Sequence, residues 1–291
     1  MITVYELIDE VNTYARGFVE LFTQLLKYRI LFRGSGLEFA GLKEYNPGED
    51  DASRIDWKSS LKSQKIFIKL YEEEKDLDIV VVVDSSSSML FGTQEKLKSE
   101  YASIIAATIT FAANDVGDNI GFGMFNEKVV RFLEPSQSSS QFFQILSCLC
   151  DDKNYGGNCK LGDTLSMLVN NLSDRTALFI ISDFLGTGEF EDQLKMCCGK
   201  FNRVFGLMVR DPRDEFIPKG LGYISLRDPY SNEIITVNAD SIQERFEKEA
   251  ARQSKHVERT FIDSGAGFIK IFTNESFAEP TIRYLKFIEG Y

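Results

Sequence analysis

The sequence predicts an α/β fold with a mostly parallel sheet and helices on both of its faces. The first indication is Ile79–Val83, an uninterrupted apolar run rich in β-branched residues. A second run of this kind is Leu178–Ile181, and expected strands alternate with expected helices between and beyond the two. Apolar runs of this length are typical of strands buried on both faces of a parallel sheet. Alternating units imply right-handed crossovers between parallel strands.

The elements expected along the chain begin with a helix over about residues 4–32, where apolar residues recur at three- and four-residue steps. A capping-box signature, Ser241 followed by Glu244, predicts the start of a long helix that stops before Gly265. The other expected elements are a helix at Lys96–Asn114, a hairpin of Ile120–Phe125 and Lys128–Phe132, helices at Gln141–Cys150 and Leu161–Leu172, a strand at Ala177–Ser182, a helix at Phe190–Cys198, strands at Val204–Val209 and Phe268–Phe272, and a helix at Ala278–Ile288.

Composition narrows the class of protein. The chain has 291 residues, and 33 Lys and Arg against 44 Asp and Glu give a net charge of −11. An acidic chain without a basic run is a poor candidate for binding nucleic acid or an anionic membrane. The five Cys form no C-x-x-C pair, which argues against a zinc knuckle and a disulfide framework. Without an 18-residue apolar run or a basic leader, we expect a cytoplasmic protein with no membrane span.

The best candidate site follows the first buried strand. Asp84, Ser86 and Ser88 place a carboxylate and two hydroxyls at every second position of the loop that leaves this strand. The carboxyl ends of parallel strands are where α/β folds place their sites. Hard oxygen ligands of this kind suit a divalent cation such as Mg²⁺ or Mn²⁺.

The spacing D-x-S-x-S after an apolar strand resembles the metal-ion-dependent adhesion site of von Willebrand factor A domains. The resemblance implies a third loop ending in an acid, and Asp183 follows the second buried run. It also implies a Thr in a second loop, after two glycines. Here either Asn158 or Cys159 takes that place, depending on a one-residue choice of alignment. An Asn carbonyl could bind Mg²⁺, whereas a thiol is a poor ligand for it.

Enzymatic interpretations are less favoured. Ser86 stands where a haloacid-dehalogenase-like phosphatase would have a second Asp. The chain has neither a phosphate-cradling G-x-x-x-x-G-K-[ST] loop nor a G-x-S-x-G nucleophile elbow. The hydroxyls of Ser85–Ser88 also have no basic partner within the motif. We therefore expect a binding module and no enzyme. The alternatives are a metal-free scaffold and a metal-dependent hydrolase built on Asp84 and Asp183.

A long signature covers residues 33–74: glycines, Glu38-Phe39, the turn Asn46–Glu49, then Arg54-Ile55-Asp56-Trp57 and a strand ending in three acids. With Val209–Glu215, it is similar to the signature of the domain-of-unknown-function 58 family, proteins with a von Willebrand factor A-like domain. We expect an N-terminal helix at residues 1–33, a signature segment at 34–77 and the main domain at 78–291.

The family resemblance implies an accessory protein that works beside a MoxR-type AAA+ ATPase. Within the signature, Arg54 and Asp56 alternate with apolar residues around Trp57, a pattern that predicts a strand with one charged face. These charges either brace the strand against the main sheet or form a recognition surface. Exposed ion pairs contribute only ~0–1 kcal/mol each, so stability alone is a weak reason for so dense a cluster.

Overall fold

The centre of the protein is a six-stranded sheet in the order β10-β7-β6-β3-β4-β5. The computed structural model describes residues 2–13, 37–46, 50, 52–63, 65–73, 77–138, 140–277 and 281. All neighbours in this sheet are parallel except β4 and β5, which form the expected antiparallel hairpin. The strands are β3 (Asp78–Asp84), β4 (Asn119–Phe125), β5 (Val129–Ser136), β6 (Thr176–Ser182), β7 (Arg203–Arg210) and β10 (Gly267–Phe272).

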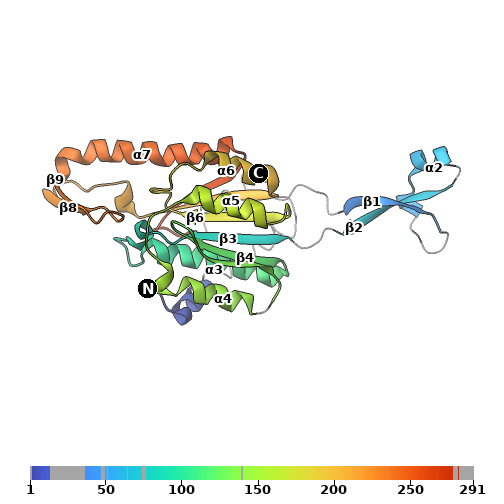
Figure 1. The fold of residues 1–291 in the computed structure, drawn as a ribbon, viewed down its shortest axis with the longest axis horizontal. Helices are drawn as coiled ribbons and strands as arrows, with labels where there is room; N and C mark the ends of the chain where they lie inside the picture. Colours follow the sequence, from blue (N-terminus) through green and yellow to red (C-terminus); the bar gives the residue numbers. More distant parts are fainter. Residues whose placement is uncertain are drawn as a thin grey trace.

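Two layers of helices cover this sheet (Figure 1). Residues 4–13, α3 (Lys98–Val116) and α4 (Gln141–Leu149) supply side chains to the core on one face. The core on the other face takes side chains from α5 (Leu161–Asn171), α6 (Glu191–Lys200) and α7 (Ala239–Asp263).

Strand β3 contributes to both cores, because successive side chains of a strand point to opposite faces. Ile79, Val81 and Val83 belong to the first core, and Val80 and Val82 to the second. The α/β class expected from the sequence, a mostly parallel sheet with helices on both faces, is confirmed.

The signature segment forms an arm, which we define as residues 37–73. Its two antiparallel strands are β1 (Leu37–Glu44) and β2 (Phe67–Glu73), and between them lie the 3₁₀ turn η1 (Ala52–Arg54) and the helix α2 (Trp57–Ser63). In Figure 1 this arm lies apart from the six-stranded sheet. The predicted strand around Trp57 is wrong. The Asp56 carboxylate accepts the backbone N–H groups of Lys58 and Ser59 and so starts a helix at this point.

A second hairpin, which the sequence did not reveal, joins β8 (Tyr223–Arg227) to β9 (Ile234–Asn238) and leads directly into α7. The predicted capping box at the start of that helix is also wrong. Its N-cap is Asn238, whose side-chain oxygen accepts the backbone N–H of Ser241. The helix ends at Asp263, two residues before Gly265 adopts a positive φ, as expected.

The other predicted elements match the observed ones to within a few residues, where the structure describes them. Residues 14–32 of the predicted N-terminal helix and most of the predicted C-terminal helix lie outside the described residues. Among the helices that the structure does describe, none combines the length and the apolar character needed to cross a membrane.

Candidate functional site

Asp84 lies at the carboxyl end of β3, and its side chain is fully buried. One carboxylate oxygen accepts the backbone N–H of Ser86 at 2.8 Å, and the other accepts the hydroxyl of Ser182 at 2.6 Å. The Ser182 hydroxyl in turn accepts the backbone N–H of Phe184 at 2.8 Å. The ends of β3 and β6 are therefore joined through this carboxylate, as expected for loops that leave the same edge of a parallel sheet.

The two hydroxyls predicted as ligands lie together beside Asp84. The Oγ atoms of Ser86 and Ser88 are 3.2 Å apart, and both residues are buried. The 3₁₀ helix η2 (Ser87–Leu90) produces this closeness by turning the chain directly after Ser86. A bond from the backbone N–H of Ser87 to the carbonyl of Gly157 ties η2 to the second loop.

Cys159, and not Asn158, faces the site from the second loop. The Cys159 thiol lies 3.4 Å from the Asp84 carboxylate and is buried. Asn158 is exposed, and both its backbone N–H and its side-chain amide donate to Glu127. Burial and the neighbouring Asp84 charge raise the pKa of the Cys159 thiol, so this group remains protonated. Of the two residues that the alignment left open, the structure places Cys159 beside Asp84 and directs Asn158 to Glu127.

Asp183 reaches the same edge but has a cation of its own. Its carboxylate lies 2.7 Å from the ammonium of Lys98, which also lies 2.9 Å from the carboxylate of Asp214. The Lys98 side chain is only 1% exposed. Burial opposes its charge, but Asp183 and Asp214 outweigh this effect and raise the pKa of the ammonium. Sequence reasoning missed Lys98, which looks like an ordinary polar residue at the start of a helix.

The electrostatic state of Asp84 differs from that of Asp183. No ion pair involves Asp84 among the residues that the structure describes. Burial, followed by the nearby charge of Asp183, raises the pKa of Asp84 to about 6. Its neutral hydrogen-bond donors only partly oppose this shift. The site therefore contains one acid with a built-in counter-ion and one without.

Tyr230, from the turn between β8 and β9, reaches the same loops. Its hydroxyl donates to the carbonyl of Leu185, two residues after the predicted ligand Asp183, at 2.7 Å. Burial raises the pKa of Tyr230, while the hydroxyls of Ser86 and Ser88 act in the opposite direction. A Cβ on Gly186 would lie 2.8 Å from the Tyr230 ring, so a glycine is needed for this approach. No periodicity in the sequence could have placed Tyr230 here.

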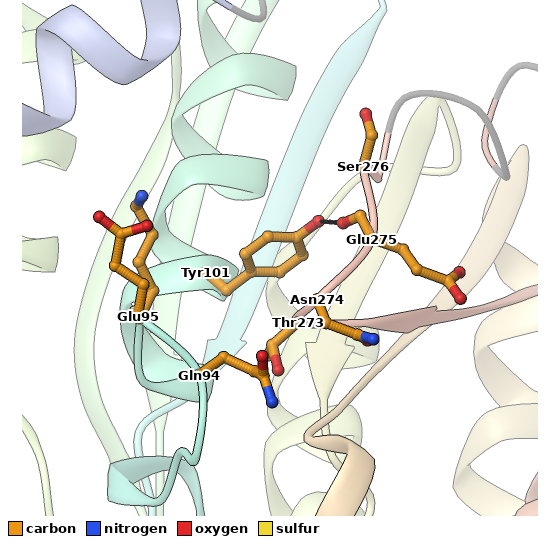
Figure 2. Close-up of a pocket in the computed structure, with 8 residues that line it drawn as sticks. Gln94, Glu95, Tyr101, Thr273, Asn274, Glu275 and Ser276 are labelled. Atoms are coloured by element: carbon orange, nitrogen blue, oxygen red, sulfur yellow. Dashed lines mark hydrogen bonds between the residues drawn. The ribbon is translucent and has the colours of Figure 1, made fainter.

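A separate hollow of about 360 Å³ lies between the segment before α3 and the segment after β10 (Figure 2). Tyr101 on α3 donates its hydroxyl to the backbone carbonyl of Glu275 across this pocket. The other lining residues are Gln94, Glu95, Lys96, Thr273, Asn274 and Ser276. Thr273 is buried, but Gln94, Glu95, Asn274 and Ser276 are exposed. We therefore centre the candidate site on Asp84, where buried polar side chains from several loops meet.

The groups at Asp84 that could bind a cation are a carboxylate and two hydroxyls, all of which offer oxygen atoms. The part of the chain that the structure describes contains no group of three or more His, Cys, Asp or Glu residues arranged to hold a metal. A cation here would depend on the hydroxyls of Ser86 and Ser88 together with Asp84. The remaining predicted site residues, Asp56 and Trp57 with Arg54 before them, belong to the arm and are not part of this cluster.

Comparison with known proteins places the chain in a family. Solved structures with a similar fold include BatB from Bacteroides thetaiotaomicron, which is 14% identical with a TM-score of 0.48, covering 74% of this chain and 100% of that one. The SpRpn10 VWA domain is 12% identical with a TM-score of 0.38, covering 72% and 94%. An uncharacterized protein of Mycobacterium tuberculosis (strain ATCC 25618 / H37Rv) is 26% identical over 258 residues, covering 88% of this chain and 80% of that protein.

The model of the protein family of unknown function DUF58 matches residues 41–256. This match includes β3, the three loops that carry Asp84, Cys159 and Asp183, and most of the arm. The chain belongs to the DUF58 family.

Proposed function

We propose that this protein is a non-enzymatic, protein-binding module that holds a divalent cation at Asp84. The observation that supports this most is the pair of hydroxyls from Ser86 and Ser88, 3.2 Å apart. They lie next to the buried carboxylate of Asp84, which forms no ion pair with any described residue. Mg²⁺ binds oxygen at about 2.1 Å in an octahedron, which puts adjacent ligands about 3.0 Å apart. The spacing of the two hydroxyls therefore suits neighbouring positions on one ion.

The residues that would hold the ion are Asp84, Ser86 and Ser88. Cys159 occupies the remaining loop position with a soft, protonated thiol, and Asp183 is engaged by Lys98. Only three hard protein ligands remain, so we propose weak binding of Mg²⁺ or Mn²⁺, with the other positions left to water or to a partner. A bound cation would supply the positive charge that Asp84 lacks and attract a carboxylate from a partner protein.

Capture of a partner also requires access. Asp84 and Ser86 are fully buried and Ser88 is 2% exposed. Tyr230 lies over the neighbouring loop, so its side chain has to move before a partner's carboxylate can reach the hydroxyls. We propose a MoxR-type AAA+ ATPase of the cytoplasm as the partner, on the basis of the family resemblance.

A metal-free scaffold is the second candidate, because Lys98 pairs with both Asp183 and Asp214 and so joins these two segments without any ion. Calorimetric titration with Mg²⁺ distinguishes the two candidates. We expect weak binding heats for the wild type and none for Asp84→Ala. The matched control is Asp78→Asn. Asp78 is also buried on β3, but at the opposite end of the strand, where it accepts hydrogen bonds from Asn119 and Ser173.

Equal binding heats from the wild type and Asp84→Ala, or no heat from either, would refute the cation site and favour the metal-free scaffold. If the protein has the cation site and also binds the ATPase, that complex should weaken on addition of chelator and on raising the salt concentration. Coordination is lost in the first case and exposed charges are screened in the second. Metal-dependent turnover of a phosphoester that disappears in Asp84→Ala would instead show an enzyme.

A further inference from the structure

Helix α2 on the arm presents its apolar side to solvent. Trp57 is 64% exposed and Leu61 is 82% exposed. These residues are four positions apart, so they share one face of the helix. Ser60, by contrast, is only 8% exposed. An ordinary amphipathic helix on a protein surface has the opposite arrangement, with its apolar stripe packed inwards.

Specific hydrogen bonds fix this orientation. The Ser60 hydroxyl donates to the carbonyl of Asp56 at 2.7 Å and accepts the backbone N–H of Phe67, the first residue of β2, at 2.8 Å. A backbone bridge between Ile55 and Ile68 ties the segment before the helix to the same strand. The Asp56 carboxylate caps the helix through the N–H groups of Lys58 and Ser59. The polar side of α2 is thus held against the arm, and the apolar side points away from it.

The exposure of these two side chains has an energetic consequence. Burying a large apolar side chain contributes about 1.5–3 kcal/mol, and this arm obtains little of that from Trp57 or Leu61. A partner that covers both would obtain it instead. Tryptophan in a central, covered position is among the residues that contribute most to protein–protein binding.

The charge near the helix indicates what kind of surface covers it. Residues 52–69 contain five cationic side chains and one anionic side chain, Asp56, for a net charge of +4. The whole chain is −11, so the other residues sum to −15. The cationic residues are Arg54, Lys58, Lys62, Lys65 and Lys69. The positive excess is local to the helix and its flanks, because the whole arm, residues 37–73, holds eight acids against six cationic residues. A partner bearing carboxylates is therefore attracted to the immediate surroundings of α2 and repelled by most of the remaining chain.

We infer that α2 is a docking helix for a protein partner, which receives Trp57 and Leu61 in an apolar pocket bordered by carboxylates. This inference rests on the proposed function, since it gives the same partner a second contact away from Asp84. A protein fits better than an anionic membrane, because carboxylates also lie on the arm. Glu44 pairs with Lys65, and Asp50 pairs with Lys43. Such alternating charges match a mixed protein surface and would be repelled by lipid phosphates.

Trp57 is the single tryptophan of the chain, so its fluorescence reports directly on docking. The experiment titrates the full-length protein with the purified MoxR-type ATPase and follows both tryptophan emission and complex formation by sedimentation, with an ATPase-only titration subtracted. We expect a blue shift on binding. Leu61→Asp should raise the Kd about tenfold or more and reduce the shift, because a charge would enter an apolar pocket. Ile262→Asp on α7 is the matched control, since Ile262 is 57% exposed and belongs to another surface.

Several outcomes overturn the inference. Complex formation with unchanged emission and an unchanged Kd for Leu61→Asp would remove the docking helix but leave the Asp84 site intact. A blue shift with vesicles of phosphatidylcholine and phosphatidylglycerol would assign the helix to membranes. A blue shift on concentrating the protein alone would assign it to a second copy of this chain. If no complex forms by sedimentation, the inferred partner is wrong, and the Mg²⁺ titration of Asp84 still decides the cation site separately.

Discussion

Replacing Asp84 by Asn tests the electrostatic state on which the proposed cation site depends. Asn has nearly the same shape as Asp and removes only the charge. Burial raises the pKa of Asp84 from its ordinary value of 3.8 to about 6 in the folded protein. Between these two pH values the folded protein binds more protons than the unfolded chain, so its stability falls as the pH rises. The variant has no such titration, and its stability should lack this component.

The size of the effect follows from the two pKa values. The rise of the pKa from 3.8 to about 6 corresponds to a destabilisation on the order of 3 kcal/mol well above pH 6. Roughly half of this destabilisation develops between pH 5 and pH 7.5. The wild type should therefore lose roughly 1–2 kcal/mol more than Asp84→Asn between these two pH values. Any constant difference from altered hydrogen bonds to Ser182 cancels in this comparison.

The assay is urea unfolding of both proteins at several pH values in chelator, repeated with saturating Mg²⁺. A bound cation favours the carboxylate and lowers its pKa, so Mg²⁺ should remove the extra pH dependence of the wild type. Curves for the two proteins that stay parallel from pH 5 to 7.5 in chelator would refute the reasoning, since Asp84 would then have an ordinary pKa or a counter-ion of its own.

Three further substitutions probe the same site. Cys159→Thr exchanges a thiol for a hard hydroxyl ligand, so calorimetry should give a higher affinity for Mg²⁺. Asn158→Ala should leave this affinity unchanged, because the side chain of Asn158 bonds Glu127. If Asn158→Ala changed the affinity and Cys159→Thr did not, Asn158 would be the ligand. Lys98→Met leaves Asp183 buried without its cation, so urea unfolding should show that the free energy of unfolding falls by about 3–5 kcal/mol. A fall below about 1 kcal/mol would mean that this ion pair does not stabilise the site.

The fold was accessible from the sequence because its strands have an unambiguous pattern. β3 and β6 are buried along their whole length, and such strands produce uninterrupted apolar runs. The arm was mispredicted for a local reason. Asp56 can cap a helix as well as alternate along a strand, and the hydrogen bonds of Ser60 decide between the two structures. The hairpin of β8 and β9 is not predicted from the sequence, because most of its residues are exposed and none contributes a buried apolar pattern.

The site was predictable only where its residues follow one another in the chain. Asp84, Ser86 and Ser88 come from one loop, and Asp183 ends a recognisable strand. Lys98 and Tyr230 reach the same place from a helix and from a hairpin turn. Their roles depend on tertiary contacts that sequence spacing does not encode. Lys98 in particular has the composition of a surface residue and becomes a buried counter-ion only because β6 and the segment after β7 both end beside α3.

The two acids of the site therefore have different roles. Asp183 is paired with an ammonium that belongs to the protein, so its position does not depend on an ion. Among the residues that the structure describes, Asp84 has only neutral hydrogen-bond donors, and burial disfavours its charge. At the site that we propose, a cation would therefore stabilise the charge of Asp84 in particular. Binding of that cation would compete with binding of a proton at a pH near 6.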